Sequence, residues 1–147
     1  MLSEILASYE WYDHPEGMKF VETHRDAHRT SGHWLILPGA FSAFHKWVAG
    51  EELWLIHAGS LALHVIEPSG TCTSLRLGMN LAAGERPVAA VPASCWQAAE
   101  LPDGVEFAFG TVVCAPPFSF EQLVTADAHR MQDEFPEHSA LIRRLTR

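Results

Sequence analysis

The fold is decided by residues 39–59, which read Gly39-Ala40-Phe41-Ser42-Ala43-Phe44-His45-Lys46-Trp47-Val48-Ala49-Gly50-Glu51-Glu52-Leu53-Trp54-Leu55-Ile56-His57-Ala58-Gly59. Two runs rich in aromatic and aliphatic residues flank a short tip at Ala49-Gly50-Glu51, a pattern typical of two strands joined by a turn. If the chain folds back at this tip as a hairpin, His45 and Glu52 lie side by side. The stretch therefore predicts a paired imidazole and carboxylate.

Side chains alternate between the two faces of a strand, which identifies the neighbours of this pair. On the first run His45 shares its face with Trp47. On the second run Glu52 shares its face with Trp54, whereas His57 points the other way. A carboxylate among apolar side chains is costly unless it is paired or faces a polar space. We therefore expect Glu52 to line a polar pocket.

Short strand-like runs separated by glycine and proline turns occupy the chain around this stretch. They span 33–37, 41–48, 52–58, 61–67, 71–77, 87–91, 95–100 and 105–114. Many short strands with tight turns are typical of an antiparallel sandwich or barrel, not of a parallel sheet with crossover helices. We expect a barrel core over about residues 33–115, preceded by a short amphipathic segment at 2–11 and a strand at 20–25.

The chain changes character after Pro117. Helical periodicity covers 120–128 and 128–135, and Pro136 suits the first turn of a final short helix that includes 138–145. We expect the tail, 118–147, to pack on the barrel within one domain that covers 1–147. The predicted fold class is all-β with a helical C-terminal tail.

Charge and cysteine content exclude several classes of partner. The chain has 147 residues and a formal net charge of −8, which disfavours nucleic acid and anionic membranes because both need clustered Lys and Arg. Neither a secretory signal nor an apolar run of about 18 residues is present. The cysteines, Cys72, Cys95 and Cys114, are odd in number and widely spaced. We therefore expect reduced thiols and a cytoplasmic protein.

Two motifs resemble those of the cupin superfamily. The first cupin motif is Gly-x5-His-x-His-x3–4-Glu-x6-Gly, and this chain has Gly39-x5-His45-x-Trp47-x4-Glu52-x6-Gly59, with Trp47 at the second histidine. The second motif is Pro-x-Gly-x2-His, and this chain has Pro92-Ala93-Ser94-Cys95-Trp96-Gln97, with Gln97 at the histidine. The resemblance implies an antiparallel double-stranded β-helix, the jelly-roll barrel of the cupins.

Further segments resemble one cupin subfamily, first catalogued as a domain of unknown function (DUF985, Cupin_5). They are His14-Pro15-Glu16-Gly17, Glu22-Thr23-His24-Arg25, Leu81-Ala82-Ala83-Gly84-Glu85-Arg86-Pro87, Val91-Pro92 with Trp96-Gln97, and Glu134-Phe135-Pro136-Glu137-His138. This resemblance runs from about residue 3 to residue 145. It implies a homodimer related to the sugar-nucleotide epimerase cupins, in a subfamily whose members mostly lack an assigned reaction.

Metal-binding cupins present about three histidines and one glutamate to a divalent ion. The matching positions here hold His45, Trp47, Glu52 and Gln97. An indole cannot ligate a metal, and an amide oxygen is a weak ligand, so we predict no metal cofactor. If an ion does bind, its ligands would be His45, Glu52 and Gln97, with His33 or His64 added from elsewhere in the barrel.

Without a metal, the resemblance and the residues favour acid–base chemistry. His45 would act as the base, and Glu52 would orient its imidazole and raise its pKa. Gln97 is a candidate to hydrogen-bond a substrate oxygen, Trp47 and Trp54 to stack on a ring, and His33 and His64 to contact the substrate. This set suits an isomerase, epimerase or lyase that acts on a sugar-like or other small polar metabolite.

Two other functions use the same pocket. One is a non-catalytic cupin that only recognises a small ligand, and the other is a metal-dependent oxygenase or isomerase with a degenerate ligand set. His45 and Glu52 can also be a satisfied polar pair inside the barrel without a chemical role. Glu22 and Arg25 are more simply explained as an ion pair than as a site.

Overall fold

The chain forms eleven strands, three short α-helices and three 3-10 turns, and the computed structural model describes all 147 residues. The strands are β1 (Tyr12–Asp13), β2 (Lys19–Arg25), β3 (Thr30–Ile36), β4 (Phe41–Trp47), β5 (Glu51–Gly59), β6 (Leu61–Ile66), β7 (Cys72–Leu77), β8 (Val88–Val91), β9 (Trp96–Glu100), β10 (Ala108–Ala115) and β11 (Leu123–Thr125). The helices are α1 (Leu2–Ser8), α2 (Ala128–Glu134) and α3 (Ser139–Arg144), and the 3-10 turns are η1 (Leu81–Ala83), η2 (Phe120–Gln122) and η3 (Pro136–His138).

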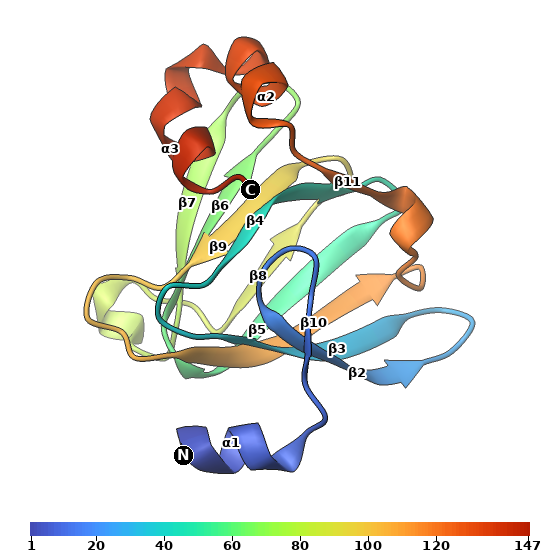
Figure 1. Ribbon diagram of the computed structural model, residues 1–147, viewed down its shortest axis with the longest axis vertical. Helices are drawn as coiled ribbons and strands as arrows, with labels where there is room; N and C mark the ends of the chain where they lie inside the picture. The colour runs from blue at the N-terminus through green and yellow to red at the C-terminus, as the bar shows by residue number, and fades with distance from the viewer.

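Two antiparallel sheets face each other and enclose the core (Figure 1). Sheet A has the strand order β1-β2-β3-β10-β5-β8, and sheet B has the order β11-β4-β9-β6-β7. The all-β jelly-roll fold with a helical C-terminal tail is therefore confirmed. The sheets take in strands from Tyr12 to Thr125, a wider range than the 33–115 predicted for the barrel core.

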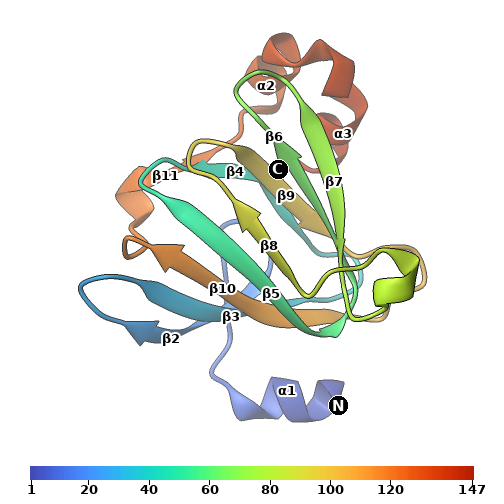
Figure 2. The same ribbon diagram turned by 180° about the vertical axis from the view of Figure 1, so that it is seen from behind.

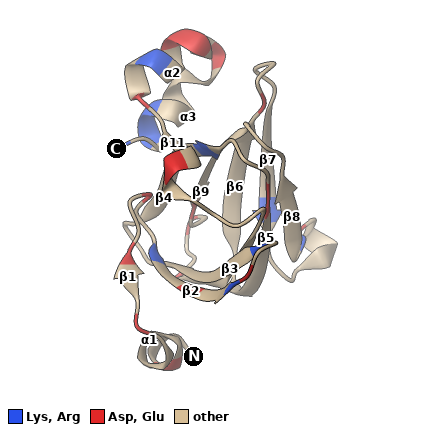
Figure 3. Ribbon diagram, turned by 90° about the vertical axis from the view of Figure 1, so that its right-hand side faces the viewer, with Lys and Arg blue, Asp and Glu red and all other residues tan.

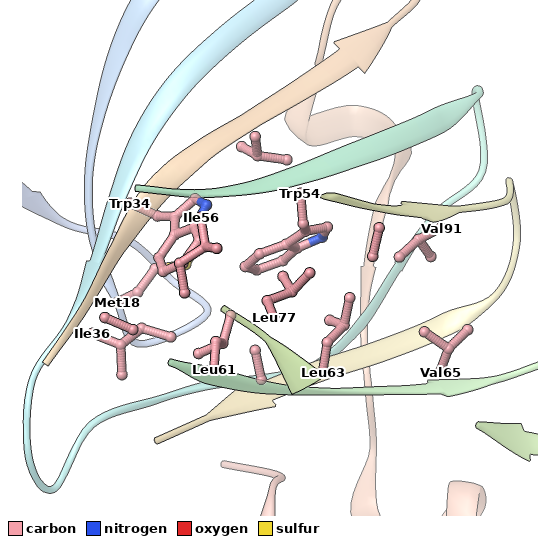
Figure 4. Packing of buried hydrophobic residues seen from close by; sticks show 14 of the residues in the cluster. Met18, Trp34, Ile36, Trp54, Ile56, Leu61, Leu63, Val65, Leu77 and Val91 are labelled. Carbon is pink, nitrogen blue, oxygen red and sulfur yellow. The ribbon is translucent and has the colours of Figure 1, made fainter. Parts of the chain in front are cut away.

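Side chains alternate between the two faces of each strand, and those on the inner face form the core. In β5 every second residue from Glu52 to Ile56 is buried, and in β10 every second residue from Ala108 to Cys114 is buried. Figure 4 shows the result, with Trp34 and Trp54 from sheet A above Leu61 and Leu63 from sheet B. The Trp34 and Trp54 rings have centroids 5.4 Å apart. The core therefore lies between the two sheets, as a sandwich of half-buried strands requires.

The outer face of sheet B is covered by α2 and α3, which lie beside β6 and β7 in both ribbon views (Figures 1 and 2). A second apolar cluster joins this face to the helices and contains Phe44, Ile66, Trp96, Ala98, Met131, Phe135, Ile142 and Leu145. The Asp127 side chain caps α2 by accepting a hydrogen bond from the Arg130 N–H at 2.9 Å. Pro136 begins η3, as predicted from its fit to a first helical turn.

Two local predictions are wrong. The helix predicted over 120–128 is instead η2 followed by β11, which pairs with β4. The predicted hairpin within 39–59 does not form, because β4 pairs with β9 and β11 in sheet B while β5 pairs with β10 and β8 in sheet A. The connection between them crosses from one sheet to the other. His45 and Glu52 consequently approach each other from opposite walls of the sandwich.

The charged residues form no dominant patch, and the cysteines form no disulfide. Lys and Arg are dispersed among Asp and Glu over the ribbon (Figure 3). The three cysteines are free thiols. None of the helices has the length and apolar character needed to cross a membrane.

Candidate functional site

A tight turn at His14–Gly17 carries Glu16 into the barrel. The Gly17 N–H donates to the His14 carbonyl at 2.8 Å, and Gly17 has a φ of +112°, which favours glycine. The Ala43 N–H donates to the Glu16 carbonyl at 2.8 Å and so ties the turn to β4. As a result the Glu16 side chain is buried between the two sheets.

An irregularity in β4 turns two of its side chains toward Glu16. The register between β4 and β9 shifts between Ser42 and His45, as in a β-bulge. The Ser42 hydroxyl donates to Glu16 Oε2 at 3.3 Å, and His45 Nε2 lies 3.4 Å from Glu16 Oε1. Strict alternation would place Ser42 and His45 on opposite faces, so the bulge is what brings both to one carboxyl group.

The hydrogen bonds fix the tautomers of the two buried imidazoles. His45 Nδ1 lies 2.7 Å from the Ala43 carbonyl, which can only accept, so Nδ1 carries the proton. In neutral His45 the Nε2 lone pair then faces Glu16, and a protonated Glu16 can donate to it. His14 Nδ1 accepts from the Glu16 N–H at 3.2 Å, so neutral His14 carries its proton on Nε2. No protein group is bonded to that Nε2.

Glu52 approaches from β5 in sheet A. Its neighbour on the same face, Trp54, donates its indole N–H to Gln97 Oε1 at 2.8 Å. Gln97 lies on β9 opposite His45, and its side chain lowers the pKa of the nearby Glu52. Both sheets thus contribute polar groups to one interior cluster.

An interior cavity of about 90 Å³ lies between this cluster and the N-terminal strands. The polar side chains that line it include those of His14, Glu16, Glu52, Glu22 and Arg25. Its aromatic lining is formed by Tyr12, Phe20, Trp54, Phe118 and Phe120.

His45 does not line this cavity. It lines a second hollow of about 200 Å³, together with Glu16 and Arg147. Of His14, Glu16, His45 and Glu52, Glu16 is the one that lines both spaces. His45 therefore lies behind Glu16 as seen from the interior cavity.

Burial determines the protonation of the four buried groups Glu16, Glu52, His14 and His45. It raises the pKa of Glu16 from 4.5 to about 8 and that of Glu52 to about 7, where the nearby Glu16 adds to the rise. It lowers the pKa of His14 from 6.5 to about 4, and it also lowers the pKa of His45. At neutral pH both imidazoles are therefore uncharged, Glu16 is mostly protonated, and Glu52 is present in both forms.

The predicted contact between His45 and Glu52 is wrong. Glu16 is the carboxylate that lies against the His45 imidazole, while Glu52 affects His45 only through its charge. The predicted rise in the His45 pKa is also wrong, because the cost of burial exceeds the attraction of Glu52.

The other predicted contacts divide between the cavity and its surroundings. Trp54 lines the cavity. Gln97 is buried behind Trp54, and Trp47 packs in the core with its ring 6.2 Å from that of Phe118, so neither lines the cavity. Burial in the core is what keeps the Trp47 ring from the stacking role predicted for it.

His33 and His64 do not lie in the cavity, which corrects the predicted position of both. His33 is on the outer face of sheet A, where it and His57 bond the Thr111 hydroxyl at 2.9 and 2.6 Å. His64 is on the outer face of sheet B and bonds Ser74 and Glu100 at 2.7 and 2.9 Å. Alternation turns these side chains outward, as it was predicted to do for His57.

Two residues of the site were not predicted. His14 and Glu16 belong to a segment that composition identifies only as a turn. The available signal was their chemistry, since an imidazole and a carboxylate flank a proline within a segment shared with the cupin subfamily. Glu22 and Arg25 do form the expected ion pair, at 2.9 Å, although they also line the cavity.

A jelly roll of two antiparallel sheets with polar groups gathered inside it defines the protein as a cupin. The chain belongs to the family described as Cupin superfamily (DUF985), whose model matches residues 3–126. It is 28% identical to a structurally characterised protein of Shewanella oneidensis, with a TM-score of 0.92 over 99% of this chain and 96% of that one. No curated protein matches the sequence significantly.

Two other solved structures support the fold alone. A hypothetical protein from Leishmania major is 21% identical, with a TM-score of 0.91 over 99% of this chain and 97% of that one. Oxalate decarboxylase from Lactobacillus farciminis, in a formate complex, is 11% identical, with a TM-score of 0.65 over 97% of this chain and 43% of that one.

The divalent ion of metal-binding cupins does not fit the residues of this chain. No group of three or more His, Cys, Asp or Glu side chains is arranged to hold a metal ion. Trp47 stands at one ligand position, and the Gln97 oxygen already accepts from Trp54 at 2.8 Å. The His45 nitrogen that is free to ligate faces Glu16.

Proposed function

We propose that the protein is a metal-independent isomerase, epimerase or lyase that moves protons on a small polar metabolite bound in the interior cavity. The observation that carries this proposal is the gathering of four buried groups, since Glu16, Glu52 and His14 line one cavity and His45 lies against Glu16. Groups whose environments bring their pKa values near neutrality are suited to both giving and taking protons at physiological pH.

The geometry supports separate roles for the carboxyl groups. Ionised Glu52 would take a proton from a carbon next to a substrate carbonyl, and protonated Glu16 would donate its proton to the carbonyl oxygen that receives the electron pair. Delivery of a proton from solvent to the other face of the carbon, with return of the oxygen-bound proton to Glu16 and release to solvent of the proton on Glu52, gives an epimer. Departure of a neighbouring hydroxyl as water, with the proton that Glu52 took and with return of the oxygen-bound proton to Glu16, gives a lyase product.

His45 would act as a positioning residue and not as the predicted base. It does not line the interior cavity, and its Nε2 lone pair faces Glu16 at 3.4 Å. That lone pair can accept a hydrogen bond from the protonated Glu16 carboxyl group and so orient it. His45→Ala should therefore leave ligand affinity within about twofold while it lowers turnover and shifts its pH profile.

Solvent exchange tests the proposal across many candidate substrates at once. The protein is incubated in D₂O with a panel of small sugars, amino alcohols and hydroxy ketones, and deuterium at carbon is followed by NMR. We expect exchange into at least one compound with the wild type and a loss of about 100-fold or more with Glu52→Gln. A compound that binds without exchange would favour the non-catalytic alternative.

Elemental analysis of the same protein tests the metal-dependent alternative. Exchange that persists in metal-free protein supports the proposal. A stoichiometric transition metal, together with activity lost on its removal and regained on its return, would replace the proposed mechanism.

A further inference from the structure

The interior cavity carries an excess of carboxyl groups over cations. Glu16, Glu22 and Glu52 line it, against the single guanidinium of Arg25. Arg25 is already committed, because its Nε and Nη2 donate to the two Glu22 oxygens at 3.0 and 2.9 Å, and Nη2 also reaches the Phe118 carbonyl at 3.2 Å. Glu16 and Glu52 are left without a cationic side chain.

Glu52 points to a missing partner most directly. It is 6% exposed and lines the cavity, and of the side chains that act on its pKa (those of His45, Glu16 and Gln97) only Gln97 does so as a hydrogen-bond donor. A buried carboxylate normally has a cation or several hydrogen-bond donors. His14 adds a second open group, since its Nε2 has no partner in the chain and the residue lines the same space.

Aromatic rings form the apolar part of the wall. Tyr12 and Phe20 meet edge to face with centroids 5.8 Å apart, and Phe118 and Phe120 do so at 5.0 Å. The faces of such rings attract cations, and a carboxylate opposite them strengthens the attraction. The one fixed positive charge on the cavity, the Arg25 guanidinium, is paired with Glu22.

From these contacts we infer that the interior cavity binds a small organic cation, an amine or quaternary ammonium compound that also bears an oxygen. The cation would lie between the Glu52 carboxylate and the aromatic wall, and its oxygen would accept from His14 Nε2. This inference names the substrate class of the proposed function and rests on the same cavity.

Proton release distinguishes a cation from other ligands. A bound cation favours the ionised form of Glu52 and expels the proton that this group partly holds in the free protein. Affinity should therefore rise between about pH 6 and pH 8, around the Glu52 pKa of about 7. The other titratable groups facing it do not reverse this sign, since Glu16 stays mostly protonated near pH 7, His14 and His45 are already uncharged, burial keeps the Cys114 thiol and Tyr12 phenol protonated, and Arg25 stays paired with Glu22.

Isosteric pairs of small molecules test the inference. Choline is compared with dimethylbutanol, in which carbon replaces the charged nitrogen, and ethanolamine with propanol. Calorimetry in buffers of different ionisation enthalpy gives both affinity and the number of protons released. We expect at least one cation to bind about tenfold or more tightly than its neutral isostere and to release protons near pH 7. Equal affinities within both pairs, or uptake of protons, would overturn the inference.

Matched variants locate the effect. Glu52→Gln keeps the shape of the side chain, so it should weaken the cation about tenfold and leave the neutral isostere unchanged. Glu106→Gln makes the same change at an exposed glutamate outside the cavity and should have no effect. A Glu52→Gln protein that binds both members of a pair as the wild type does would contradict the assigned site.

The experiments can contradict the proposed reaction and the proposed cation binding independently of each other. A cation that binds with proton release but exchanges no deuterium would leave the binding inference standing and remove the proposed reaction. Deuterium exchange into a neutral compound, with no preference for cations, would do the reverse.

Discussion

Glu16 and Glu52 hold their protons far more tightly in the folded chain than in the unfolded one, because burial disfavours their charged forms. In the unfolded chain both ionise near pH 4.5. Folding is therefore linked to proton uptake by these groups in the range between that value and about pH 7 to 8. Their contribution to stability is fully present below the unfolded pKa and is lost as the pH rises through the folded pKa.

Between about pH 6.5 and pH 8, we expect stability to fall by about 1–2 kcal/mol, since each unit of pKa shift corresponds to about 1.4 kcal/mol. This window lies above the unfolded pKa of His14 and His45, whose lowered pKa values give linkage of the opposite sign at lower pH. Glu52→Gln removes one of the two groups and should flatten this slope, with a gain in stability at the alkaline end. Urea unfolding followed across the pH range measures it. Glu106→Gln is the control and should run parallel to the wild type, and a wild-type slope of opposite sign would refute the linkage.

The hydrogen bond from Trp54 to Gln97 is a second buried interaction whose effect on stability can be measured. Trp54→Phe removes the indole donor and leaves the buried Gln97 oxygen without that partner, which should cost about 1–3 kcal/mol in addition to lost packing. Gln97→Leu in the Trp54→Phe background removes the stranded group. Unfolding of the single and double variants should show less than additive losses, and strict additivity would mean that the bond contributes nothing.

Among the elements, the β4 bulge and the C-terminal helices decide what each face of sheet B does. The inner face carries His45 and, through the bulge, Ser42 toward Glu16. The outer face is apolar and is closed by α2 and α3. Packing of the tail and positioning of Glu16 therefore depend on opposite faces of one sheet.

Truncation of Ile142 in α3 should destabilise the fold without changing ligand affinity. Ile142 is fully buried, so Ile142→Ala should cost about 2–5 kcal/mol and Ile142→Val about 0.5–1.5 kcal/mol. Urea unfolding gives these losses, and calorimetry with a cavity ligand gives the affinity. A change in affinity beyond about twofold in the folded variants would show that the tail is coupled to the cavity.

For the whole molecule, the homodimer implied by family resemblance remains a prediction. Its support is the outer face of sheet A, where Leu53 is 39% and Val88 is 47% exposed on neighbouring strands. Sedimentation at micromolar concentration should show a dimer for the wild type and a monomer for Leu53→Asp. Leu75→Asp alters a leucine of similar exposure on the edge strand β7 and should leave the dimer intact. A monomeric wild type would remove the prediction.

The sequence by itself determined where most of the strands lie, though not β1 or β11, and its motifs identified the fold they make. Turn residues and the alternation of apolar side chains are local properties, and they placed runs such as 52–58 and 61–67 close to β5 and β6. Alternation also turned Glu52 and Trp54 inward and His57 outward. The motif positions were sufficient for the family.

Only the tertiary structure decided which groups meet. The pairing of β4 and β5 with different sheets, the bulge that turns Ser42 inward, and the insertion of Glu16 beside His45 all depend on hydrogen bonds between distant segments, such as that from Ala43 to Glu16. Tertiary structure also decided how tightly His45 and Glu16 hold their protons. Neighbours in the sequence suggested a raised pKa for His45, whereas the depth of burial, which follows from packing of the whole chain, keeps His45 neutral and lets Glu16 keep its proton.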